Sequence, residues 1–234
     1  KMDDARSESE RKQIKSRAIE YTKRTSVNFV GVNKQRGEGK KERFYDIENV
    51  TLSHTFNEVQ QHNFEVENML DQQARSSLDY SYAFKPWNLE PFKKADGLKK
   101  IKYFNLLTDF NLNLLPTNVT FQSNVLRQYN QQKYRMIDVE GIEIQPLYRR
   151  NYFFNYNYGV NFNLTKNLSL NYTASNNNVV RNYYDEQMYV DNSQGIWSGY
   201  FDPGTPNLRM QSFKLDYKLP LNKIPFLNFL DATY

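Results

Sequence analysis

The side chains that most often carry chemistry are sparse in this sequence. It holds two histidines, His54 and His62, and no cysteine, which excludes thiolate chemistry and a disulfide framework. His54 falls on the apolar side of an alternating stretch and His62 in a turn, so we interpret both as structural. No phosphate-binding loop, H-E-x-x-H zinc motif or G-x-S-x-G nucleophile elbow occurs. We therefore expect no catalytic residue, no cofactor, no metal ion and no enzyme activity.

Two charged groups could still bind ions. Asp138, Glu140 and Glu143 form an acidic group that could hold calcium, although a solvated loop is the simpler interpretation. The basic stretch 93–102 (KKADGLKKIK) could meet lipopolysaccharide phosphates, or nucleic acid if the protein were soluble. Here too a solvated loop is favoured. We expect lipid and lipopolysaccharide as contacts, and no nucleic acid.

The composition excludes a membrane-spanning helix but not membrane-spanning strands. Of 234 residues, 39% are hydrophobic and 15% aromatic, with a net charge of +5. No run of about 18 apolar residues is present, as a spanning helix would require. A membrane β-barrel shows only alternation. Because the chain starts in a charged stretch and stops inside an apparent strand, we expect a mature segment or a fragment.

Hydrophobic residues recur at every second position, which is typical of β-strands. The clearest case is 151–177 (NYFFNYNYGVNFNLTKNLSLNYTASNN), where apolar positions alternate with Asn, Ser and Thr. Residues 1–24 are expected to form a charged loop or frayed helix, and 25–234 a β segment. The pattern predicts strands near 26–33, 47–57, 64–84, 104–114, 119–129, 151–164, 168–175, 211–219 and 227–234.

The predicted connections alternate between short and long. The short ones are 58–63, 115–118, 165–167 and 220–226, and the long ones are 34–46, 85–103, 130–150 and 176–210. In an up-and-down meander, this alternation places all the short turns at one end. Outer-membrane barrels are built this way.

Strand length favours a membrane wall over the alternative hypothesis, a soluble β-protein. Strands of roughly 10 to 14 residues exceed the about five or six usual in soluble sheets and suffice for a tilted membrane strand. In lipid every backbone group must be paired, so strands join until the sheet closes. We predict an all-β fold: antiparallel up-and-down transmembrane β-barrel strands, about eight or nine, forming part of a larger barrel wall.

In such a wall the polar positions face a wet lumen and the apolar positions face lipid. The lumen-lining candidates are Asn111, Asn113, Gln122, Asn124, Asn155, Asn157, Asn161, Asn163, Asn171, Lys214, Asp216 and Lys218. The lipid-facing candidates are Phe110, Leu112, Phe121, Val125, Phe154, Tyr158, Phe162, Leu170, Phe213 and Leu215.

Several stretches, in order, resemble one family. They are RTSVNFVGVNKQR (24–36), FYDIENVTLSHTFNEV (44–59), LLTDFNLNLLPTNVTFQSNVLRQYN (106–130) and YKLPLNKIPFLNF (217–229). Together they resemble part of the outer-membrane translocon of the type IX secretion system, the SprA/Sov family of the Bacteroidota. The resemblance covers nearly all of 24–234.

The resemblance implies a very large barrel that conducts folded cargo proteins across the bacterial outer membrane. It implies a PorV-like barrel and a periplasmic plug protein as partners, and no catalytic residues. Alternation alone leaves other interpretations of the function open. These are another transport barrel such as a TonB-dependent receptor, a small complete barrel acting as adhesin or anchor, or an outer-membrane enzyme.

Overall fold

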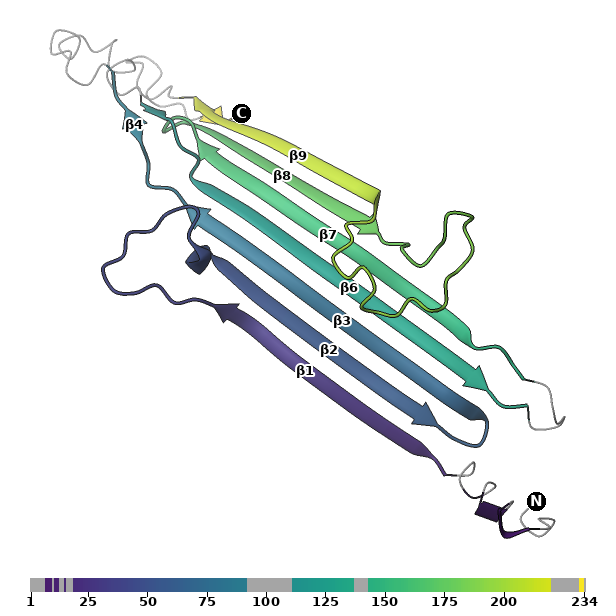
Figure 1. The fold of residues 1–234 in the computed structure, drawn as a ribbon. Helices are drawn as coiled ribbons and strands as arrows, with labels where there is room; N and C mark the ends of the chain where they lie inside the picture. The colour runs from purple at the N-terminus through teal and green to yellow at the C-terminus, as the bar shows by residue number, and fades with distance from the viewer. Residues whose placement is uncertain are drawn as a thin grey trace, which may run out of the picture.

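One long antiparallel sheet dominates the structure (Figure 1). The computed structural model describes residues 7–9, 11–12, 15, 19–91, 111–136, 143–219 and 232–233. Within them, the sheet has the order β1-β2-β3-β6-β7-β8-β9-β10, so each strand pairs with the next one of the sheet along the chain. The predicted all-β, antiparallel, up-and-down arrangement is confirmed. The sheet is open and does not close into a barrel.

Seven of the strands are long, with 12 to 18 residues each. A short 3-10 helix, η1 (Ile47–Asn49), precedes β2. No helix among the described residues is long and apolar enough to cross a membrane. The strands of the sheet are β1 (Tyr21–Asn33), β2 (Val50–His62), β3 (Val66–Ala83), β6 (Asn118–Tyr134), β7 (Leu147–Asn163), β8 (Leu168–Val179), β9 (Thr205–Leu219) and β10 (Ala232–Thr233).

A nearly uninterrupted register aligns the strands into cross-strand rows. One row joins Phe29, His54, Ser76, Val125 and Phe154 across five strands. Since successive residues point to opposite faces of a sheet, every member of a row lies on the same face.

A β-bulge between Phe29 and Val32 absorbs one extra residue of β1. Gly31 lies inside it with φ of 68°, a left-handed conformation that glycine adopts without a steric cost. The bulge returns Val32 to the face that Phe29 occupies, so the alternation of apolar and polar residues survives it.

The termini differ from the expected boundaries. β1 begins at Tyr21, inside the segment expected to be a charged loop, although part of 1–18 lies outside the described residues. Of the strand expected at 227–234, the described part is Ala232–Thr233, which pairs with Leu219 and Lys218.

The described residues place no strand of 104–114 between β3 and β6. Residues 104–110 lie outside the described part of the chain, and β3 pairs directly with β6 along their whole lengths. The described remainder includes β5 (Leu112–Asn113), which pairs with β4 (Asn88–Leu89) in a separate two-stranded sheet. The period-two pattern of 111–114 therefore did not distinguish a strand of the long sheet from a strand of the small sheet.

The predicted alternation of short and long connections is also wrong. With one strand fewer, the turn 164–167 lies at the same end as the long connections 34–49 and 84–117. The turn 63–65 shares the opposite end with 135–146 and 180–204. Loop length therefore does not separate the two ends of this sheet.

Cysteine cross-linking tests the β3–β6 contact, because the chain has no cysteine of its own. Ser77 and Asn124 are direct partners, and such pairs have Cα atoms about 4.5–5.5 Å apart, within reach of a disulfide. We expect S77C/N124C to form an intramolecular disulfide on mild oxidation, seen as a gel shift that reductant reverses. S77C/N155C, two strands apart, is the control and should stay reduced. A strand inserted between β3 and β6 would leave both pairs reduced.

Candidate functional site

The polar residues gather on one side of the sheet, here called the amide face. It comprises the odd positions of β2, β3, β7 and β8 and the even positions of β6 and β9. Ten of the twelve lumen-lining candidates project from this face: Gln122, Asn124, Asn155, Asn157, Asn161, Asn163, Asn171, Lys214, Asp216 and Lys218.

Amide side chains bond to one another across the strands of this face. Asn177 Nδ2 donates to Asn155 Oδ1 at 2.6 Å, and Asn207 Nδ2 donates to Asn177 Oδ1 at 3.2 Å. An amide carries both donors and an acceptor, so a row of them can bond internally and to water without a net charge. Lys214 and Asp216 form an ion pair at 3.2 Å.

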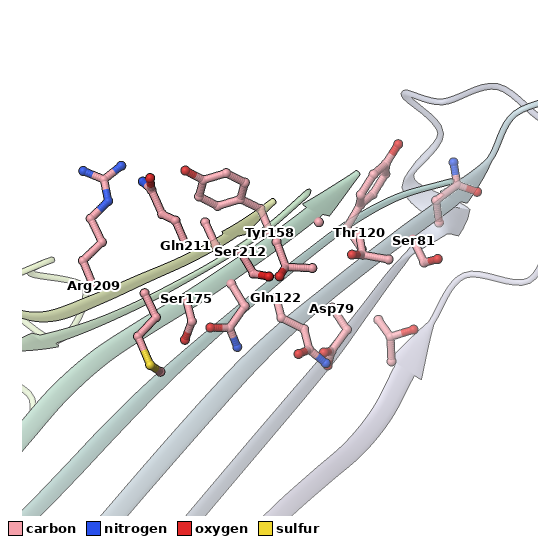
Figure 2. A pocket seen from close by; sticks show the side chains of 17 residues that line it. Asp79, Ser81, Thr120, Gln122, Tyr158, Ser175, Arg209, Gln211 and Ser212 are labelled. Carbon is pink, nitrogen blue, oxygen red and sulfur yellow. The ribbon is translucent and has the colours of Figure 1, made fainter. Parts of the chain in front are cut away.

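A hollow of about 1120 Å³ lies over the centre of the amide face. Its lining includes two complete cross-strand rows, one of which is Ser81, Thr120, Gly159, Thr173 and Ser212. These side chains are small, whereas the neighbouring row carries the longer Asp79, Gln122 and Met210, so the surface dips along the first row. Figure 2 shows Asp79, Gln122 and Ser175 extending to one side of the sheet, whereas Tyr158, Arg209 and Gln211 extend to the other.

Asn111 and Asn113 lie at β5 and not in the long sheet, but they line a hollow of about 460 Å³ together with Asn163, Asp216 and Lys218 of the amide face. Both are buried beside the β7–β8 turn. Asn111 Oδ1 accepts a hydrogen bond from Lys166 N at 2.8 Å, and Asn113 Oδ1 accepts one from Trp87 N at 3.1 Å. Asn113 N donates to Leu164 O at 2.8 Å. These amides satisfy buried backbone groups, and so fix the β4–β5 segment to the sheet.

The opposite side, here called the apolar face, carries most of the lipid-facing candidates. Phe121, Val125, Phe154, Tyr158, Phe162, Leu170, Phe213 and Leu215 all project from it. Phe110 lies outside the described residues, and Leu112 belongs to β5. No second layer of strands covers this face among the described residues. Phe213 is 64% exposed and Leu215 50% exposed.

The apolar residues of this face form an oblique band. On β1 the band is centred on Phe29, in the row that ends at Phe154 of β7. On β9 it is centred on Leu215, in the row of Leu170 and Phe162. Phe154 and Phe162 are about 8 residues apart on β7, or roughly 26 Å, while β1 to β9 is six strand steps, or roughly 29 Å. The band therefore crosses the rows at roughly 40°.

Polar residues bound the band toward the β2–β3 turn. Glu58 accepts hydrogen bonds from Gln60 and Gln72, at 3.0 and 2.6 Å. On the strands beyond, Arg127, Arg150 and Asn176 stand on the same side of the band. The apolar face is thus divided between an apolar band and a polar margin.

Residues 180–204, here called the covering loop, connect β8 to β9 and fold back over this margin (Figure 1). Val180, Ile196 and Tyr200 of the loop pack with Ala74, Val125, Tyr129 and Tyr152 of the sheet. Val125 is consequently only 3% exposed, and Phe154 packs against the same cluster. Among the lipid-facing candidates, these two are covered by the chain itself because the loop lies on them.

Arg127 holds the covering loop in place. Its side chain is fully buried, and Nη2 donates to Gly199 O at 2.7 Å and to Tyr200 O at 2.9 Å. The guanidinium also lies 4.7 Å from the ring centroid of Tyr152 and 5.9 Å from that of Tyr200. Carbonyl oxygens and aromatic faces thus replace part of the water that a buried cation loses, while Nε and Nη1 donate to no partner among the described residues.

Two further contacts attach the loop to β2 and β3. Ser76 Oγ lies 2.8 Å from His54 Nδ1 and 2.9 Å from Tyr200 Oη. Burial raises the pKa of the Tyr200 phenol, which therefore stays protonated in this chain of hydrogen bonds. The Trp197 ring lies 5.2 Å from Phe56. His54 thus bonds within the sheet, and no group of three or more possible metal ligands occurs in the described ranges.

Sequence reasoning missed the covering loop and its anchor. Arg127 sits at an apolar position of an alternating strand, which is the one local signal that a partner must lie above it. Its partners follow more than 70 residues later in the chain. A scan against protein-family models and a search of the curated proteins find no match to this chain.

Replacing Arg127 tests this anchor. In R127A the carbonyls of Gly199 and Tyr200 lose a charged donor, which costs roughly 1.5–3 kcal/mol. We expect cleavage within 180–204 by a protease of broad specificity to accelerate by about tenfold or more. R149A is the matched control, because Arg149 is exposed on the amide face. Equal cleavage rates in both variants would contradict the anchoring role.

Proposed function

We propose that this chain forms a stretch of the wall of a protein-conducting β-barrel in a bacterial outer membrane, as its resemblance to the SprA/Sov family implies. The oblique band is the observation that carries the proposal. Strands of membrane barrels tilt by about 35–45°, so a membrane plane crosses their cross-strand rows at the same angle. The inclination of roughly 40° agrees with that tilt.

The exposed band also argues against a soluble sheet. A soluble β-protein covers its apolar face with a second layer. Here the covering loop shields the polar margin and the adjoining rows, while Phe213 and Leu215 remain exposed. Large contiguous apolar surface of this kind marks a membrane or protein contact.

The β1 edge of the sheet favours a part of a larger wall over a small complete barrel. β1 is a 13-residue edge strand whose other side pairs with no strand among the described residues. In lipid each unpaired backbone group costs several kcal/mol, so further strands would have to complete the wall on that side.

The amide face supplies the conduit surface in this proposal. Asn, Gln, Ser and Thr hydrate well, and bonded amide rows such as Asn155–Asn177–Asn207 carry no fixed charge that would retain a passing protein. The hollow lies on this face, as expected if the wall curves toward it. By resemblance, the cargo would be folded secreted proteins, with a PorV-like barrel and a periplasmic plug as partners.

Site-specific labelling tests the membrane wall. Single cysteines are introduced at Phe213 and Leu215, and at the adjacent Ser212 and Lys214 as matched controls on the other face. In the complete protein in its membrane, we expect spin labels at the first two to be relaxed by oxygen dissolved in lipid. Labels at the controls should be relaxed by a water-soluble nickel chelate. The same relaxation by nickel at all four positions would contradict a lipid-facing band.

Substitution of the amide row tests the conduit. We expect N124L/N155L/N177L to slow the release of secreted cargo by about tenfold, since exposed apolar side chains bind passing apolar surface. N124T/N155T/N177T, which keeps polar side chains with a strong preference for strands, is the control. Cargo retained in the periplasm is measured by immunoblot, with barrel assembly checked by heat modifiability. Normal secretion in a properly assembled leucine variant would count against this role.

A further inference from the structure

We infer that the covering loop is a membrane-interface anchor, whose exposed aromatic residues insert among the lipid headgroups beside the barrel wall. This inference rests on the proposed membrane wall. It concerns a surface distinct from the conduit, on the opposite side of the sheet. The loop is proposed to contact the interfacial region of one lipid leaflet.

The first step is the position of the loop. It lies on the apolar face, where lipid would be, and over the boundary between the apolar band and the polar margin. In a membrane wall that boundary coincides with the headgroup region, because charged residues such as Arg150 and Glu58 are costly in the hydrocarbon core. The loop is therefore at headgroup depth.

The second step is the chemistry of what the loop exposes. Trp197 is 49% exposed, and Tyr189 and Phe201 are each 73% exposed. Tyr189 lies between Met188 and Val190 in a turn in which Tyr189 N donates to Asp185 Oδ1 and Asp185 N donates to Tyr189 O. All three consecutive side chains are exposed there. Trp and Tyr are the residues that collect at membrane interfaces, where one end of the ring is apolar and the other wet.

The third step is continuity with the band. Trp197 contacts Phe56 and lies 6.0 Å from His54. The cross-strand neighbours of these two residues on β1 are Val27 and Phe29, which are exposed members of the band. The apolar surface therefore runs from Val27 through Phe56 onto Trp197 of the loop.

The fourth step is charge. Residues 180–204 contain one basic residue, Arg181, and the acidic residues Asp185, Glu186, Asp191 and Asp202. Attraction to anionic lipid therefore does not hold the loop. The pKa of Asp191 is lowered by hydrogen bonds from Ser193 and Gln194, so this carboxylate stays ionised at neutral pH. Attachment through apolar burial should be insensitive to salt.

Depth-dependent quenching tests the inference. Cysteines at Tyr189 and Phe201 are labelled with an environment-sensitive fluorophore in the complete protein, reconstituted in phosphatidylethanolamine–phosphatidylglycerol vesicles. Both side chains are largely exposed, so labelling disturbs little packing. We expect lipids brominated near the headgroup to quench both labels at least about twofold more than lipids brominated near the chain ends. The pattern should be unchanged by added salt.

Labels at Phe213 and Gln122 are the controls for lipid and lumen. Quenching at Phe213 without quenching at Tyr189 and Phe201 would overturn the anchor and leave the membrane wall standing. Shielding of the loop labels from both lipid and aqueous iodide would show that a protein covers the loop, which would also overturn the anchor. Absence of lipid quenching at Phe213 itself would instead overturn the proposed function.

Discussion

The register of the antiparallel ladder is the constraint on which every other feature depends. Because the side chains of a strand alternate between faces, a slip of one residue would exchange the two faces of that strand. The register is kept across seven strands, and the bulge at Gly31 takes up the one extra residue of β1 without changing the face of Val32. Two further irregularities lie between Val66 and Asn68 and between Asn177 and Asn178, the latter where β8 approaches the covering loop. The separation of an amide face from an apolar band follows directly from this pairing.

The covering loop explains how the apolar face can carry charged residues at one end. In the proposed membrane wall, strands of 15 or more residues exceed the length that a tilted strand needs, so their ends would stand outside the hydrocarbon. There the face carries Arg127, Arg150 and Glu58, which require polar partners. The loop supplies carbonyl oxygens to both arginines: Gly199 and Tyr200 to Arg127, and Gln194 to Arg150. The same loop buries Val125 and Tyr152, so the polar margin becomes a small packed core.

How much the sequence predicts depends on how local the determining interactions are. Alternation located the paired strands and assigned ten lumen candidates to a common face, because a period of two is set within each strand. It failed at 111–113, because Asn111 and Asn113 alternate with Leu112 yet lie at β5 of the small sheet, where they bond to the backbone of Lys166 and Trp87. It could not reveal the covering loop, whose contacts with Arg127 and Ser76 join residues far apart in the chain. The predicted alternation of short and long connections failed because no strand of the described residues lies between β3 and β6 in the sheet. One strand fewer places every later turn at the opposite end.

The oblique band is the feature that favours the proposed tilted wall over a flat sheet with one apolar side. A sheet that packs on a helix or a second sheet buries a patch whose outline follows its partner, with no fixed relation to the strand direction. A lipid slab imposes a straight band at one angle, and that angle must equal the strand tilt. From Phe29 on β1 to Leu215 on β9 the centre of the band moves in one sense, toward the β7–β8 turn. Neighbouring strands added at either edge would have to continue this displacement, so that their apolar centres lie about one to two residues further along with each step.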